Sequence, residues 1–289
     1  MIRMKGLSVL LLATAFAFVH GSSQDLTMTS QGKLRKYRLH VPSSYNGKKA
    51  VPLVLVLHGR GGQGAGFEQT SQMSPVSDQK GFIVVYPSAI GTPPAWKTDW
   101  DWSNAGTNDV QFIKELIDKI EGKYKIDKKR VFCAGFSSGG IMCHQLGASL
   151  SHRFAAIAVV EGTIGAKKDG VTNQVPSPSE PVSAIMFHGK DDHTVSYEEG
   201  PVPQYPDWTF LSIHESVDFW VQHDGCSTPP TKITSDGGNV VRSRYPNGQH
   251  GTDVVLYSIG DGTHRWQNPN TGFETRNAIW AFFAKHPKQ

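Results

Sequence analysis

The chain has 289 residues, of which 38% are hydrophobic and 19% are charged. This composition is ordinary for a soluble globular protein and provides enough apolar residues for one large buried core. The formal net charge of +4 is too small to indicate a nucleic acid or an anionic membrane as the partner.

The first 21 residues have the pattern of a targeting signal. Arg3 and Lys5 precede an apolar run at residues 6–19, which is shorter than the ~20 residues that span a bilayer. We therefore expect a signal peptide at residues 1–21, cleavage before Ser22, and a secreted (extracellular or periplasmic) chain of net charge +2. An uncleaved anchor or a lipoprotein signal is the alternative. A single catalytic domain is expected at residues 22–289.

Short apolar segments after this point have the pattern of strands. The segment 34–41 alternates as a half-buried strand does. The other segments are continuous apolar runs, many of them bounded by glycine or proline, at residues 51–57, 81–86, 130–134, 155–160, 183–188 and 253–259. Such runs are typical of strands buried on both faces of a parallel sheet.

Helical patterns alternate with these runs. Apolar residues recur every three or four positions in the segment 108–124. Asn108 and Gln111 are expected to form a capping pair at its start. Residues 212–223 and 271–284 are also expected to be helical, whereas 171–181 and 200–209 are expected to be a surface loop and an irregular insertion. The alternation predicts an α/β fold, a mostly parallel sheet with helices on both faces.

The stretch Gly135-Phe136-Ser137-Ser138-Gly139 fits the pattern G-x-S-x-G between a strand and a helix. In this turn the middle serine is exposed as a nucleophile, and the next backbone N–H points at the developing oxyanion. Ser137 is therefore the expected nucleophile and Ser138 an expected oxyanion donor. The alternative is an ordinary helix start that a serine caps.

A serine nucleophile in this architecture needs an acid and then a histidine further along the chain. The run at 183–188 leads into Asp191 and Asp192, and either carboxylate can orient an imidazole. His264 follows the last expected strand in a glycine-containing loop and is the histidine that satisfies both order and position. A solvated turn and a surface histidine are the alternatives.

The segment His58-Gly59-Arg60-Gly61-Gly62 follows the second expected strand. It is similar to the H-G-G-G-type oxyanion loop, in which the Arg60 N–H would be the second donor. The overlapping pattern G-x-G-x-x-G could also mark a dinucleotide site, but the next strand ends without the acidic residue that holds a ribose.

No metal-binding motif occurs, and the three cysteines are an odd number. We therefore expect no cofactor, no metal and no disulfide.

Together these motifs resemble the secreted esterases of polyhydroxybutyrate depolymerase and feruloyl esterase type, a family of α/β-hydrolases. The resemblance runs from about residue 34 to 283 through PLVLVLHGRGG, RVFCAGFSSGGIMC, FHGKDDHTV and GDGTHRWQ. The family pattern H-G-x-x-D-x-x-V assigns the acid to Asp192, and its G-H-x-W-P motif aligns with His264 and Trp266. Thr263 and Gln267 depart from that motif.

The resemblance implies a secreted serine esterase with the triad Ser137, Asp192 and His264. Its expected substrates are feruloyl or acetyl esters of plant or algal polysaccharide, or hydroxyalkanoate polyester. Trp102, Trp208 and Trp266 are the expected substrate-binding side chains, although tryptophans at 96, 100 and 102 can also cover the core. A secreted serine peptidase of the same fold and a non-catalytic binding protein are the alternatives, and no nucleic acid is expected as a partner.

Overall fold

The structure is a computed structural model that describes residues 21–99, 107–203, 205–269 and 271–289. Its main feature is a ten-stranded sheet of order β1-β2-β4-β3-β5-β6-β9-β14-β13-β12. The strands are β1 (Ser22–Ser30), β2 (Lys33–Val41), β3 (Val51–Leu57), β4 (Ile83–Pro87), β5 (Ile126–Phe136), β6 (Ala156–Val160), β9 (Ser183–Gly189), β12 (Thr231–Ser235), β13 (Val240–Tyr245) and β14 (Val254–Ile259).

The centre of this sheet is parallel and its edges are antiparallel. Strands β4, β3, β5, β6, β9 and β14 run parallel, and they correspond to the continuous apolar runs of the sequence. Strands β1 and β2 at one edge, and β13 and β12 at the other, pair antiparallel. The predicted α/β fold with a mostly parallel sheet is confirmed.

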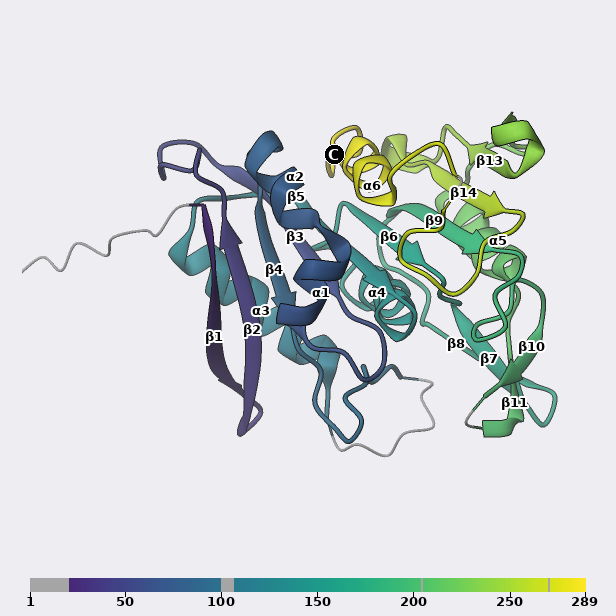
Figure 1. The fold of residues 1–289 in the computed structure, drawn as a ribbon, viewed down its shortest axis with the longest axis horizontal. Coiled ribbons are helices and arrows are strands. Elements are labelled where there is room, and N and C mark those ends of the chain that lie inside the picture. Colours follow the sequence, from purple (N-terminus) through teal and green to yellow (C-terminus); the bar gives the residue numbers. More distant parts are fainter. Residues whose placement is uncertain (1–20, 100–106, 204, 270) are drawn as a thin grey trace, which may run out of the picture.

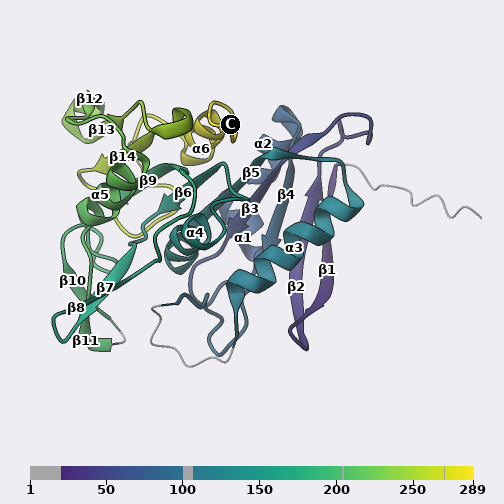
Figure 2. The same ribbon diagram turned by 180° about the vertical axis from the view of Figure 1, so that it is seen from behind.

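Helices cover both faces of the sheet (Figures 1 and 2). One face packs against α1 (Gly64–Ser71), α2 (Met73–Lys80) and α6 (Thr275–Phe283), and the other against α3 (Asp109–Lys123), α4 (Ser138–Ser149) and α5 (Ile213–Asp224). Each interface is a separate apolar core. Alternate side chains of a strand point to opposite faces, so a continuous apolar run fills both cores.

A small second sheet corrects two expectations about loops. It has the order β10-β11-β7-β8 and consists of β7 (Gly165–Lys168), β8 (Val171–Gln174), β10 (Gly200–Val202) and β11 (Tyr205–Phe210). Both segments expected to be irregular, 171–181 and 200–209, therefore contribute strands. Short length and nearby prolines hid these strands, and the two hairpins, β7–β8 and β10–β11, join into one sheet only through the long-range pairing of β11 with β7.

The N-terminal part of the described chain begins on the sheet. The Gly21 N–H donates to the Val41 carbonyl at 2.9 Å, and β1 follows directly. Apart from Gly21, the expected signal peptide at residues 1–21 lies outside the described residues. None of the helices in the described ranges is long and apolar enough to cross a membrane. Cys133, Cys143 and Cys226 are free and buried.

A buried histidine joins α4 to α5 and makes the fold sensitive to acid. The Trp220 indole donates to His144 Nδ1 at 2.9 Å, and the His144 side chain is fully buried. Burial, together with the nearby His188, lowers the pKa of His144 to about 3. Between this value and 6.5 the unfolded imidazole binds a proton that the folded one does not, so stability falls as the pH falls through this window.

We expect His144→Gln to weaken this acid sensitivity. The side-chain carbonyl of the introduced glutamine can still accept from the Trp220 indole, but the glutamine amide binds no proton. The free energy of unfolding of the wild type should fall more steeply from pH 6 to pH 4, by up to about 1.4 kcal/mol per pH unit relative to the variant. Urea titrations at several pH values measure this difference. Parallel pH dependences in the two proteins would contradict the assignment.

Candidate active site

Ser137 occupies a sharp turn between β5 and α4. Its backbone angles, φ 54° and ψ −122°, lie in a region that is unfavourable for a residue with a side chain. The turn is fixed from both sides, because the Ser137 N–H donates to the Val160 carbonyl and the Ile141 N–H donates to the Ser137 carbonyl, each at 2.9 Å. The fold thus holds this serine in a strained position at the carboxyl end of the sheet.

The two glycines of the motif are required by close packing. A Cβ atom at Gly135 would lie 2.2 Å from the Gly139 carbonyl oxygen, and a Cβ atom at Gly139 would lie 2.3 Å from the Leu57 carbonyl oxygen. Any larger residue would push α4 away from the sheet. The pattern G-x-S-x-G is therefore a geometric requirement of this turn.

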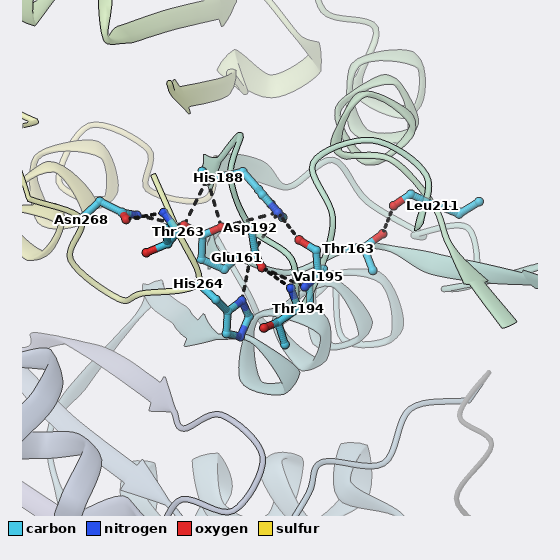
Figure 3. Close-up of polar contacts among 11 residues, drawn as sticks. Glu161, Thr163, His188, Asp192, Thr194, Val195, Leu211, Thr263, His264 and Asn268 are labelled. Carbon is cyan, nitrogen blue, oxygen red and sulfur yellow. Dashed lines mark hydrogen bonds and ion pairs between the residues drawn. The ribbon is translucent and has the colours of Figure 1, made fainter. Parts of the chain in front are cut away.

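Asp192 and His264 form a hydrogen-bonded pair (Figure 3). His264 Nδ1 lies 2.7 Å from Asp192 Oδ2, while the other carboxylate oxygen accepts from the backbone N–H groups of Thr194 at 2.7 Å and Val195 at 3.0 Å. The Asp192 side chain is buried, whereas its neighbour Asp191 is exposed. The structure thus pairs Asp192, rather than Asp191, with the imidazole.

The contacts of Asp192 favour its ionised form. Burial alone would raise the pKa of its carboxyl, but the hydrogen bond and charge of His264, with the two backbone donors, outweigh burial and lower that pKa. An ionised Asp192 fixes the tautomer of His264 with the proton on Nδ1. The Nε2 atom of His264 is then free to accept a proton.

The His264 ring lies next to the turn at Ser137. It packs against the ring of Phe136, the residue before Ser137, with a centroid distance of 4.8 Å. The two departures from the family motif have partners of their own: the Thr263 N–H donates to Asn268 Oδ1 at 2.8 Å, and Gln267 Oε1 accepts from the Thr275 N–H at 2.6 Å. These contacts hold the loop between β14 and α6.

The loop that follows β3 lies against Ser137. A Cβ atom at Gly59 would be 3.3 Å from the Ser137 Cβ atom, so this loop lies close to the serine turn. His58 organises this loop: its Nε2 accepts from the Ala89 N–H at 3.0 Å, and its carbonyl accepts from the Trp96 indole at 2.8 Å. Burial lowers the pKa of His58, which favours its neutral form.

The expected substrate-binding tryptophans have different environments. Trp266 is 5% exposed and packs edge-on against Phe67 in the core under α1. Trp208 lies half-buried in β11, with the Lys168 ammonium 5.6 Å from its ring centroid. Trp102 lies outside the described residues.

The sequence patterns missed one buried acid beside the Asp192–His264 pair. Glu161 follows β6 directly, and its carboxylate lies with His188 and Asp192 in a buried group whose ligand-type atoms are within 4.8 Å of one another (Figure 3). These atom types could hold a metal ion, but His188 and Asp192 are already engaged with Val195 and His264. Glu161 carried no signal, because a single acid after an apolar run fits many loops.

The order of these parts along the chain defines the class of protein. A serine turn after a central strand, then an acid, then a histidine, all on a mostly parallel sheet, is the arrangement of the α/β-hydrolases. A solved acetyl xylan esterase from Aspergillus awamori has the same fold, with a TM-score of 0.67, 19% identity, and coverage of 91% of this chain and 99% of that one.

Comparison of sequences then gives the family. Residues 35–190, more than half of the chain, match the family model described as esterase PHB depolymerase, and the chain belongs to this family. Feruloyl esterase B of Piromyces equi is 30% identical over 83% of this chain, which spans 44% of that longer protein. Feruloyl esterase D of Neurospora crassa is 26% identical over 91% of this chain and 86% of its own length. The predicted class, a carboxylic ester hydrolase, is confirmed.

Proposed function

We propose that the chain is a secreted serine esterase that hydrolyses feruloyl or acetyl esters of polysaccharide. The observation that carries the proposal is the 2.7 Å contact between His264 and Asp192 beside the strained turn at Ser137. The names of the relatives, two feruloyl esterases and an acetyl xylan esterase, support this substrate class. The apolar segment at residues 6–19 supports secretion.

The proposed reaction proceeds through an acyl-enzyme. Ser137 Oγ attacks the ester carbonyl while His264 Nε2 takes its proton, and Asp192 stabilises the imidazolium that forms. The backbone N–H groups of Arg60 and Ser138 hold the tetrahedral oxyanion. When the intermediate collapses, His264 gives the proton to the departing alcohol. Water then attacks the acyl group, again with His264 as base, and releases the carboxylic acid.

A substrate panel tests this function directly. Methyl ferulate, acetylated xylan and hydroxybutyrate oligomers are offered to the purified protein, together with the anilide of ferulic acid. We expect turnover of the first or second ester, and much slower turnover of the anilide. Hydrolysis of the hydroxybutyrate oligomers alone would replace the polysaccharide ester by a polyester. Preferential anilide cleavage would indicate the peptidase alternative, and turnover of nothing in the panel would contradict the proposal.

A further inference from the structure

Glu161 is held in a position that its own backbone disfavours. Its φ of 50° lies in the left-handed region, where a residue with a side chain is strained, and its N–H donates to the Phe187 carbonyl at 2.9 Å. The side chain is fully buried. The strained backbone therefore places a carboxyl group inside the protein, at the carboxyl end of β6 and next to β9.

Both oxygens of this carboxyl group are engaged. The Gly189 N–H lies 3.2 Å from Oε1 and 3.0 Å from Oε2, and Asn268 Nδ2 donates to Oε1 at 3.0 Å. His188 Nε2 lies 3.5 Å from Glu161 Oε2 and 3.7 Å from Asp192 Oδ2. Two carboxyl groups therefore meet at the edge of one imidazole ring, as the cluster in Figure 3 shows.

The groups around Glu161 supply too little positive charge for two carboxylates. His188 donates its Nε2 proton to the Val195 carbonyl at 2.8 Å, and burial lowers its pKa, so it is neutral near pH 7. The more distant His144 is neutral for the same reason. Among the residues that the structure describes, His264 is the remaining titratable partner, and it is bound to Asp192. The two carboxyl groups belong to one buried cluster whose ligand-type atoms lie within 4.8 Å of one another. Two carboxylates this close repel, so one of them is expected to hold a proton.

The proton belongs to Glu161. Burial and the negative charge of Asp192 raise the pKa of Glu161 well above its usual range. The pKa of Asp192 is lowered instead, because Asp192 accepts from His264 and from two backbone N–H groups.

We propose that Glu161 is a positioning residue for the triad acid: it is a neutral carboxylic acid in the resting protein and donates a hydrogen bond to Asp192. As a neutral donor it orients Asp192 without adding a second negative charge near His264. A second negative charge beside Asp192 would favour the protonated form of the imidazole over the neutral form that acts as the base. Glu161 loses its proton when the pH rises above its raised pKa. The hydrogen bond to Asp192 is then lost and a second negative charge appears near His264, so activity should fall.

Infrared spectroscopy tests the protonation state without using activity. The difference spectrum between the wild type and Glu161→Gln near pH 7 should contain the C=O stretching band of a protonated carboxylic acid. Glu68→Gln is the matched control: Glu68 is also buried, but hydrogen bonds from Ser23, Ser74 and Arg38 outweigh burial and lower its pKa. Its difference spectrum should contain carboxylate bands instead. Carboxylate bands in the Glu161 difference spectrum would overturn the proposal.

Steady-state kinetics test whether Glu161 positions Asp192. This second test rests on the proposed esterase function. Glu161→Ala should lower kcat at least about tenfold, as the loss of a hydrogen bond to a charged group does, and Glu161→Gln should restore most of this loss because its amide can donate. In Glu161→Gln the acidic limb of kcat/KM should stay in place and the alkaline limb should move to higher pH. An acidic limb that shifts to lower pH would show that a negative charge had been removed, and would contradict a neutral Glu161.

The two readouts separate this inference from the proposed function. A wild type that hydrolyses no ester would refute the esterase, while the infrared band would still decide the state of Glu161. Conversely, an active esterase with an ionised Glu161 would refute only the inference. If Glu161→Ala does not fold, Glu161→Gln and the infrared measurement still decide the question.

Discussion

Ser137→Ala is expected to lower kcat for a p-nitrophenyl ester by about 10⁴-fold or more, because the variant lacks the atom that would form the acyl-enzyme. The fold should be retained. The variant removes one oxygen atom, and the turn is fixed by backbone hydrogen bonds that alanine can make equally well. The measurement is steady-state hydrolysis, with the thermal unfolding temperature as the check on folding.

Ser138→Ala is the matched comparison for this variant. The Ser138 hydroxyl is buried without a hydrogen-bond partner among the described residues, and the proposed role of Ser138 uses only its backbone N–H. We therefore expect a far smaller loss of kcat than in Ser137→Ala. A loss confined to Ser138→Ala would make Ser138 the nucleophile and would refute the assignment of the turn.

Asp192→Asn should have the second largest effect, a decrease in kcat of roughly 10⁴-fold at neutral pH. The amide of asparagine can donate to His264 Nδ1, which favours the tautomer with the proton on Nε2. The Nε2 atom can then no longer accept a proton from Ser137. Substrate binding should change little, so the loss should appear in kcat rather than KM.

Asp191→Asn provides the control for this variant. Asp191 is adjacent in sequence and exposed, and His264 contacts Asp192 and not Asp191. The control should retain its kcat. Equal losses in both variants would point to a general effect of charge in this loop, and retained activity in Asp192→Asn would exclude Asp192 as the acid.

The parts of the fold that could be predicted are those with strong local patterns. The central parallel strands are apolar on both faces, and α3 combines an apolar stripe with the cap in which Asn108 accepts from the Gln111 N–H. The short helices α1 and α2 lack such a stripe, and every described side chain of β12 is exposed. Tertiary contacts rather than local preference determine those elements.

The start of α6 shows how a side-chain contact overrides a pattern. The apolar spacing predicted a helix from residue 271, but α6 begins at Thr275. Thr271 and Gln267 make hydrogen bonds within the preceding loop, and Gln267 accepts from the first N–H of the helix. This loop carries His264, so its shape is part of the site, and spacing alone gave no sign of it.

Motifs that fix both residue type and order led to Ser137, Asp192 and His264, and the structure brings Asp192 and His264 into contact next to the turn of Ser137. Glu161 could not be predicted, because its role depends on two neighbours that the sheet brings to it from 27 or more positions away. Trp266 shows a related limit. A tryptophan next to a catalytic-type histidine can face a substrate or the core, and only the packing against Phe67 distinguishes the two.

The most direct test of the central claim is to trap the covalent intermediate. The protein is treated with a fluorophosphonate, which reacts with activated serine nucleophiles, and the site of modification is mapped by peptide mass spectrometry. One adduct on Ser137 is expected, absent in Ser137→Ala and strongly slowed in Asp192→Asn. Failure to label the folded wild type, or an adduct on another residue, would contradict the proposed mechanism.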